Sequence, residues 1–366
     1  MMNLLNKNCR FCEGNNIFEF NFNNLYFPTK NYKKWKNVYC KSCGSVSHYI
    51  NKGKIISYAD GSYRNRNVKP TKIDNKFFNV FPPIDPWSTH TYYRWIEIYS
   101  NLIKFTNVLN KNVALNHLDY GGYNGFLPHA LAQILKINST VADLDKRGLN
   151  IASSLGFETI DLSIKNIPSD KKYDLITMIH VLEHIDEPKK LLLSLKNSLE
   201  SKGILYIEVP NLFGIPMQRE SHISSFTLES FIRNMPIFGF TILKSGFSQS
   251  TYNTFDFGFN YISKKENIYV ICTLNNKEVI DKKVSLFKNK NQLIKKLNYE
   301  YSKISLKNIS SMHLKKVFLH FFYFLIYFFP ALIDFIFVRF INISISFYLL
   351  RPLNKITYKI LNFFKK

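Results

Sequence analysis

The chain has 366 residues, of which 46% are hydrophobic and 16% aromatic, so it is too apolar to be wholly disordered. With 14 glycines and five cysteines, it is neither collagen-like nor a dense disulfide framework. The net charge of +23 lies at the two ends: residues 1–118 carry +11, residues 119–250 carry −1 and residues 251–366 carry +13. Only nine of the 49 basic residues are arginine, the type that clamps phosphates and reads bases, so the charge does not favour nucleic acid as a partner.

Two C-x-x-C pairs lie near the N-terminus, Cys9 with Cys12 and Cys40 with Cys43. Each spacing lets one tight turn present two thiolates to a metal, and two such turns complete the four-sulfur site of structural zinc. The pairs therefore predict a zinc-ribbon module over residues 1–60. Disulfides, an iron–sulfur cluster and thioredoxin-like redox chemistry are the alternatives. The polar N-terminus has no long apolar run, which predicts a cytoplasmic protein.

Prolines punctuate the next segment, residues 61–112, which we interpret as a linker followed by a helix. Apolar residues recur at helical spacing within residues 87–110.

A glycine-rich turn opens the electrically balanced middle of the chain. A short apolar run ends at Asp119, and Gly121, Gly122 and Gly125 precede a helix-like stretch. Glycines let the backbone approach a ligand closely, and a helix N-terminus offers free N–H groups. Asp143 ends the next strand, where a carboxylate can accept hydrogen bonds from both hydroxyls of a ribose. A plain helix N-cap is the alternative for Asp143.

Strands and helices alternate after this turn. We predict strands near residues 115–119, 139–143, 158–162, 173–179 and 204–211, with helices near 126–135, 148–157 and 189–203. This alternation is typical of a doubly wound, mostly parallel α/β sheet with its ligand at the carboxyl edge of the strands. We assign the domain to residues 113–275. Cys272, in the apolar run NIYVICTL, is interpreted as a core residue.

The chain resembles the class I S-adenosylmethionine-dependent methyltransferases. The resemblance covers about residues 113–250 and is carried by LDYGGYNG, VADLD, ETIDLS, YDLITMIHVLEHIDEPKKLL and GILYIEVPN. It implies a Rossmann-like fold, enzymatic methyl transfer and S-adenosylmethionine as cofactor. A short four-cysteine module before this domain also resembles bacterial methyltransferases of sugar and surface-polysaccharide biosynthesis.

The resemblance implies a role for each matching residue of the cofactor site. Asp119 and the three glycines would shape the loop beneath the methionine part, and Asp143 would hold the ribose. The remaining residues would pack on or border the adenine or face the cofactor: Leu144, Asp161, Leu162 and His180. For Asp161 a simple loop carboxylate is the alternative. The family commonly has G-x-G-x-G, whereas here Tyr123 stands at the middle position.

Two histidines are the predicted catalytic candidates. His222 lies in RESHISSFT, where the family often places an H-x-x-x-F-[ST] segment facing the acceptor, and His184 lies beside Glu183 in HVLEHI. Histidine titrates near neutral pH and suits a general base that deprotonates an oxygen nucleophile. For His184 and Glu183 the alternative is that they pin the following helix.

Residues 276–366 form a basic, aromatic-rich tail that we predict to be helical. In residues 317–338 the only ionisable groups are His320 and Asp334; Lys315 and Lys316 flank the segment on one side and Arg339 on the other. This pattern fits helices lying on an anionic membrane surface, contacted through residues 314–366 on the inner face of the cytoplasmic membrane. Buried helices covering the central domain are the alternative.

The sequence thus favours methylation of a small-molecule or glycan acceptor, with a sugar oxygen or carbon as the leading choice. A nucleic-acid or protein methyltransferase that reads its substrate with the basic N-terminal module is the second hypothesis. A zinc-containing membrane scaffold without activity is the third.

Overall fold

The computed structural model covers the whole chain. It describes residues 8–20, 35–50, 98, 101–102, 114–132, 135–214, 222–248, 266–274 and 287–310. The predicted membrane-contact segment, residues 314–366, and most of residues 61–112 lie outside these ranges.

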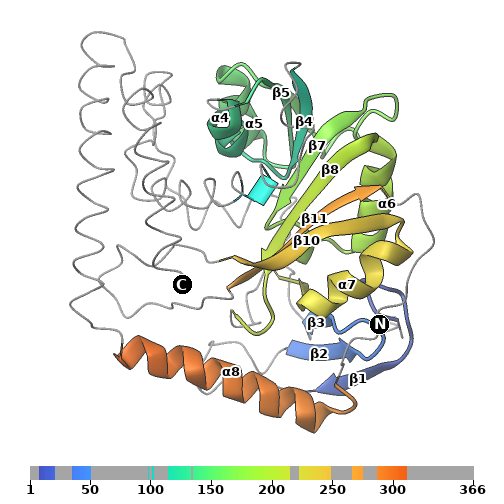
Figure 1. The fold of residues 1–366 in the computed structure, drawn as a ribbon, viewed down its shortest axis with the longest axis vertical. Coiled ribbons are helices and arrows are strands. Elements are labelled where there is room, and N and C mark those ends of the chain that lie inside the picture. The colour runs from blue at the N-terminus through green and yellow to red at the C-terminus, as the bar shows by residue number, and fades with distance from the viewer. Residues whose placement is uncertain are drawn as a thin grey trace.

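A seven-stranded sheet forms the centre of the molecule (Figure 1). Its strand order is β10-β11-β8-β7-β4-β5-β6. The bounds are β4 Leu115–Tyr120, β5 Ile137–Asp143, β6 Glu158–Asp161, β7 Tyr173–Ile179, β8 Leu199–Pro210, β10 Phe240–Ser248 and β11 Asn267–Leu274. The strands from β6 to β8 pair in parallel, whereas β11 joins β8 and β10 joins β11 antiparallel. The α/β fold class expected from the sequence is confirmed, with an antiparallel pair at one edge.

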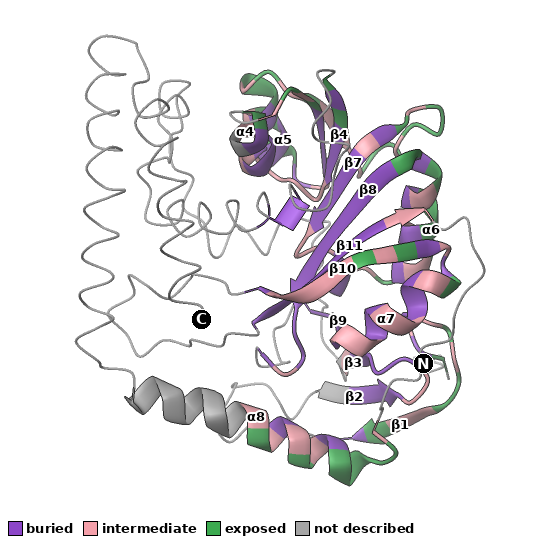
Figure 2. Ribbon diagram, viewed as in Figure 1, coloured by how far each residue is buried: buried purple, intermediate pink, exposed green. Residues whose placement is uncertain are grey.

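Alternating side chains of the central strands enter two different cores. In β7, Ile176 and Met178 join the larger cluster, whereas Leu175 joins the cluster on the opposite face. Helices α6 (Pro188–Ser198) and α7 (Leu228–Ile237) pack on the larger cluster, and α4 (Phe126–Ala132) packs on the other. Because both faces are covered, β7 and β8 are buried along most of their length, as Figure 2 shows. Cys272 of β11 is fully buried, as expected for a core residue.

One predicted element boundary is wrong. The helix expected over residues 189–203 ends at Ser198, and β8 begins at Leu199. Leu199 pairs with Tyr173 at the start of β7, and the register then shifts before Ile204 meets Leu175. The buried Leu199 therefore belongs to the strand and not to the helix. Its pairing with Tyr173 is a tertiary contact, which the helical spacing of apolar residues does not reveal.

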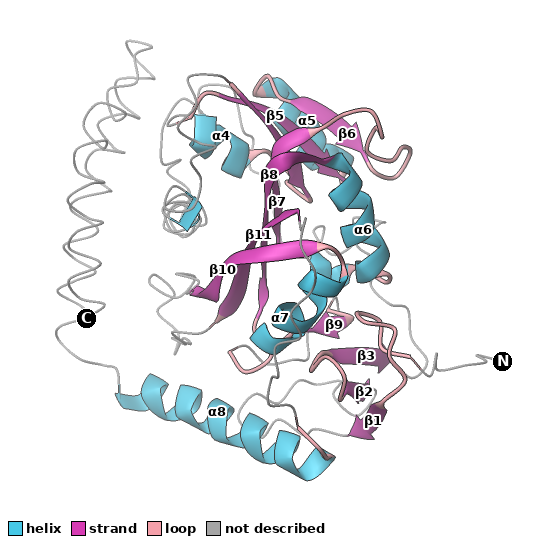
Figure 3. Ribbon diagram, turned by 45° about the vertical axis from the view of Figure 1, so that its right-hand side comes forward, coloured by secondary structure: helices cyan, strands magenta, loops and turns pink. Residues whose placement is uncertain are grey.

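A second, four-stranded sheet lies beside the central one and combines the N-terminus with a later segment. Its order is β1 (Ile17–Phe20), β2 (Trp35–Cys40), β3 (Val46–Ile50) and β9 (Ser224–Ser225), all antiparallel. In both ribbon views α7 lies on one side of this sheet and α8 (Lys290–Ser310) on the other (Figures 1 and 3). The four-cysteine segment is thus built into the same body as the α/β sheet.

Aromatic packing holds the two sheets together. Phe11 contacts the rings of Phe226, Phe231 and Phe238 edge-on, with centroid distances of 5.1–5.6 Å. Such contacts add about 0.5–1.5 kcal/mol each beyond simple burial. Arg233 of α7 also donates to the backbone carbonyl of Ser42 at 2.7 Å. Within the described part of the chain, no helix is both long and apolar enough to cross a membrane.

Candidate functional site

The parallel register brings the carboxyl ends of three strands to one edge. Asp119 of β4 stands opposite Val141 of β5 on one side and Thr177 of β7 on the other. Asp143 of β5 stands opposite Asp161 of β6. Ligands of open α/β sheets bind outside this edge, where the strand order reverses. Here the reversal occurs at β4, which is followed by the glycine-rich turn.

The turn after β4 requires glycine for two separate reasons. Gly121 has φ +75° and donates its N–H to the Ala142 carbonyl at 2.7 Å, which fixes the turn against β5. Gly122 lies directly over the carboxylate of Asp119, so that a Cβ there would overlap with it. The backbone thus passes close above Asp119, as a loop that cradles a ligand must do.

Asp119 is buried at the end of a hydrogen-bond chain. The Thr177 hydroxyl donates to Asp119 Oδ1 at 2.7 Å. His117 Nε2 lies 2.8 Å from that hydroxyl oxygen, and His117 Nδ1 lies 3.0 Å from Ser139 Oγ. Burial lowers the pKa of His117 to about 3, so its ring is neutral. Because the Thr177 hydroxyl donates to Asp119, the Thr177 oxygen accepts a hydrogen bond from the protonated Nε2 of His117. The unprotonated Nδ1 then accepts a hydrogen bond from the Ser139 hydroxyl.

Burial also raises the pKa of Asp119, to about 7, against the lowering effect of the Thr177 hydrogen bond. The nearby Asp143 carboxylate contributes a smaller increase. Burial removes water from the Asp119 carboxylate. A positively charged group beside it would therefore stabilise its ionised form. His117 and Thr177 were missed from the sequence because each lies in an apolar run that reads as plain core strand.

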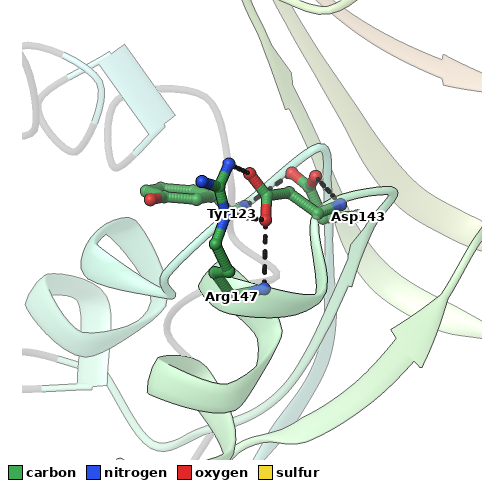
Figure 4. Close-up of polar contacts among 4 residues, drawn as sticks. Tyr123, Asp143 and Arg147 are labelled. Atoms are coloured by element: carbon green, nitrogen blue, oxygen red, sulfur yellow. Dashed lines mark hydrogen bonds and ion pairs between the residues drawn. The ribbon is translucent and has the colours of Figure 1, made fainter. Parts of the chain in front are cut away.

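Asp143 anchors the glycine-rich turn (Figure 4). Its Oδ2 accepts the Tyr123 N–H at 2.9 Å and its Oδ1 accepts the Asp145 N–H at 2.9 Å. The N-cap of α5 (Lys146–Ser154) is Asp145, whose side chain accepts the Arg147 N–H. The N-cap alternative for Asp143 is therefore wrong. Each Asp143 oxygen has capacity for a further hydrogen bond, since a carboxylate offers about four acceptor positions.

Tyr123, the departure from the usual glycine pattern, has φ +49°. Its ring packs over Gly148 in the first turn of α5, where a Cβ would overlap with the ring. Gly148 thus accommodates the tyrosine. The Arg147 guanidinium pairs with Asp145 at 2.8 Å in the same turn.

The residues after β5 and β6 border the same edge. Leu162 donates its N–H to the Asp143 carbonyl at 2.9 Å, which ties the two strand ends together. Asp161 accepts from the Ser163 hydroxyl and N–H, which together lower its pKa, and its carboxylate lies 3.4 Å from Lys146 Nζ. Leu144, which lies between Asp143 and Asp145 in the sequence, is partly buried.

The predicted catalytic histidines come together at the ends of β7 and β8. The rings of His184 and His222 meet edge-on with centroids 4.9 Å apart. Glu183 is buried beside them, with Oε1 3.7 Å from His184 Nε2 and 3.5 Å from His180 Nδ1. His180 directly follows β7, has φ +53° and also lies 3.8 Å from Glu208 Oε1. The site therefore joins imidazoles and carboxylates, the groups of acid–base chemistry.

The four cysteines of the N-terminal module also converge. Their sulfurs all lie within 4.8 Å of one another, with Cys9–Cys43 at 3.6 Å and Cys12–Cys40 at 3.5 Å. A tetrahedral zinc with Zn–S bonds of about 2.3 Å needs sulfurs about 3.8 Å apart, so the set fits zinc. A disulfide needs about 2.0 Å, so these cysteines are thiols and the disulfide alternative is wrong.

Comparisons with known proteins concern the central domain. Residues 89–245 match a family described as "Methyltransferase domain". Over 151 residues the chain is 27% identical to the mitochondrial ubiquinone biosynthesis O-methyltransferase of Candida albicans, a match covering 36% of this chain. It covers 46% of that enzyme, so the chain spans about half the length of this curated relative.

Two solved structures are similar at low identity. One is an S-adenosylmethionine-dependent methyltransferase from Clostridium acetobutylicum, 16% identical with a TM-score of 0.37, covering 60% of this chain and 99% of that one. The other is the N-methyltransferase NodS from Bradyrhizobium japonicum, 15% identical with a TM-score of 0.38, covering 51% and 98%.

The raised pKa of Asp119 predicts a measurable pH dependence of stability. The folded chain holds a proton on Asp119 between about pH 4 and pH 7, where the unfolded chain does not, so this carboxyl lowers stability as pH rises through that window. Asp119→Asn removes the ionisation and keeps an acceptor for Thr177. We expect the variant to gain on wild type between pH 5 and pH 8 by about 3 kcal/mol, because about two pH units of that interval lie below the Asp119 pKa, at about 1.4 kcal/mol per unit.

Urea denaturation of both proteins at the two pH values measures this difference. Asp170→Asn, at an exposed loop position, is the control and should follow wild type at both. If the free energy of unfolding of Asp119→Asn changes from pH 5 to pH 8 by the same amount as that of wild type, the raised pKa of Asp119 is contradicted.

Proposed function

We propose that this chain, whose residues 89–245 match a family described as "Methyltransferase domain", is a class I S-adenosylmethionine-dependent methyltransferase that transfers a methyl group from S-adenosylmethionine to a small-molecule acceptor. The observation that carries the proposal is the family match, together with an aspartate at the end of β5 that faces a glycine-rich turn after β4. The name of the curated relative, an O-methyltransferase of ubiquinone biosynthesis, supports a small acceptor. Within that class, we propose a sugar hydroxyl or carbon.

The residues of the sheet edge suit the cofactor's chemistry. When bound, S-adenosylmethionine supplies an electrophilic methyl group on a sulfonium. Asp143 has acceptor positions left for two ribose hydroxyls, while its backbone contacts keep the turn in place. Asp119 would stabilise the cationic methionine end from below the turn. Leu144 and Leu162 would pack on the adenine, Asp161 would border its amino group, and His180 would face the cofactor.

His222 would act as the general base. For an oxygen acceptor, a ring nitrogen of His222 would take the proton of the acceptor hydroxyl. The buried Glu183 and the neighbouring His184 ring would orient His222 and stabilise its protonated form. Most of the remaining rate enhancement would come from holding the acceptor in line with the methyl group.

We also propose that Cys9, Cys12, Cys40 and Cys43 hold one structural zinc ion. The N–H groups of Phe11 and Gly14 point at the sulfurs of Cys9 and Cys12, at 3.3 and 3.4 Å, as backbone amides do around thiolates. Four protein ligands leave no position for substrate, so the metal would support the fold.

Calorimetric titration with S-adenosylmethionine and S-adenosylhomocysteine tests the cofactor site. We expect saturable binding by wild type, and at least about a tenfold loss in Asp143→Ala, because hydrogen bonds to a carboxylate contribute about 1.5–3 kcal/mol. Asp170→Ala, on an exposed loop, should bind like wild type. No binding by folded wild-type protein would reject the methyltransferase proposal in favour of a scaffold.

His222→Ala tests the base. Wild type and variant are compared for S-adenosylhomocysteine release with a panel of nucleotide sugars as acceptors. We expect a rate loss of about 100-fold or more on the acceptor found, with cofactor affinity unchanged, since general bases contribute about 10²–10⁴-fold. A rate within a few-fold of wild type would show that another group takes the proton.

Metal analysis tests the zinc proposal. Wild type purified with added zinc is expected to hold one zinc per chain, and Cys40→Ser to lose most of it. The matched control is Cys272→Ser, which removes a fully buried thiol outside the cluster and should keep the metal. Equal zinc content in the two variants, or none in wild type, would contradict a four-cysteine site.

A further inference from the structure

His48 of β3 is a fully buried histidine that the proposed reaction does not use. Its Nδ1 lies 2.8 Å from Asn37 Oδ1, and its Nε2 lies 2.7 Å from Ser225 Oγ. Burial lowers the pKa of His48 to about 3, so the ring is neutral. Because Nδ1–H donates a hydrogen bond to the Asn37 side-chain oxygen, the unprotonated Nε2 accepts a hydrogen bond from the Ser225 hydroxyl. The ring therefore bridges two segments that lie 177 residues apart in the sequence.

The backbone reinforces this bridge. The His48 N–H donates to the Ile223 carbonyl at 2.9 Å, and β3 pairs with β9 through Val46 with Ser225 and Ser47 with Ser224. These contacts fix residues 223–225 along β3. His222, the proposed base, directly precedes this segment in the chain.

The same segment is held from its other side by the central domain. The Ile223 N–H donates to the Glu183 carbonyl at 2.9 Å, next to the His184 ring that meets His222. Residues 222–225 thus lie between the turn at Leu182–His184 and the N-terminal sheet. Ile223, directly after His222, is therefore hydrogen-bonded to both sides.

The four-cysteine cluster fixes the start of β3. The turn between β2 and β3 holds Cys40 and Cys43, with Gly44 donating its N–H to the Cys40 carbonyl at 2.8 Å. Ser45 Oγ lies 3.2 Å from Cys9 Sγ and 3.0 Å from Cys43 Sγ, directly before β3 begins. The cluster, the turn and His48 therefore form one continuous support.

We propose that His48 is a positioning residue for methyl transfer: through Ser225 and the Ile223 carbonyl, the N-terminal module holds the acceptor-side segment that carries His222. This rests on the proposed role of His222. The module is then a part of the acceptor site and does more than stabilise the fold. A neutral, two-sided histidine suits this task because it fixes the distance between Asn37 and Ser225 with one rigid ring.

Adjacent serines of β9 provide a matched test. Ser225→Ala removes the hydroxyl that His48 accepts from, while Ser224→Ala removes a buried hydroxyl that has no hydrogen-bond partner among the described residues. Ser225→Thr keeps the hydroxyl and serves as the rescue. All are full-length proteins, compared for thermal midpoint, S-adenosylmethionine affinity and the ring signals of ¹³C-labelled histidines. The His222 signal is assigned from its loss in His222→Asn.

We expect Ser225→Ala to move the His222 signals and their titration beyond what Ser224→Ala does, with the His117 signals and the cofactor affinity unchanged. Ser225→Thr should return the His222 signals toward wild type. On an identified acceptor, kcat should fall by up to about 100-fold in Ser225→Ala, because small misplacements of catalytic groups cost that much. His222 signals that are the same in both alanine variants would overturn the proposal.

The two ideas fail separately. Wild-type protein that binds no S-adenosylmethionine rejects the proposed function, while the comparison of serine variants still measures whether His48 holds the His222 segment. Conversely, normal cofactor binding with unmoved His222 signals in Ser225→Ala rejects only the positioning role.

Discussion

The parallel pairing of β4 between β5 and β7 is the constraint on which the site depends. It places Asp119, Asp143 and Thr177 at one edge and forces the chain after β4 to turn sharply over a buried carboxylate. Only glycine fits directly above Asp119, so the turn is fixed by sterics as well as by the hydrogen bond from Gly121 to Ala142. The backbone of this turn is therefore held in place by the residues beneath it.

Burial of Asp119 has an energetic cost that the surrounding strands partly offset. The chain from Ser139 through His117 and Thr177 gives the carboxylate one well-directed donor, yet burial still raises its pKa to about 7. The buried Asp119 therefore lowers the stability of the folded chain as the pH rises toward 7.

The N-terminal module extends this organisation to the other half of the site. Its four thiols fix a turn, the turn fixes β3, and β3 pairs with a two-residue strand taken from the central domain. Phe11 closes the contact by packing among three aromatic rings of α7 and its flanks. This shared interface adds buried contacts to a small sheet whose other core cluster, around Phe20, Tyr39 and Val46, is completed by α8.

Local patterns were sufficient for the order of the elements. The period of the apolar residues predicted the strands, and the glycine turn and Asp143 were correctly predicted to lie at one edge, since carboxyl ends of parallel strands share one side. The paired cysteines likewise predicted a cluster, because C-x-x-C spacing acts within one turn. These features depend on neighbours in sequence, and the structure reproduces them; the roles of the residues in binding and catalysis stay predictions.

The sequence by itself thus determined the α/β fold, the cysteine cluster and which residues lie at the carboxyl edge of the parallel strands. Tertiary structure alone decided that Leu199 begins a strand, that Asp145 caps α5 in place of Asp143, and that His48 meets Ser225. Each of these depends on partners that are distant in the chain or on the exact direction of a side chain at a helix start. The spacing of apolar residues in the sequence does not reveal such contacts. A buried, hydrogen-bonded histidine stands at the same inward-facing strand positions as an apolar core residue.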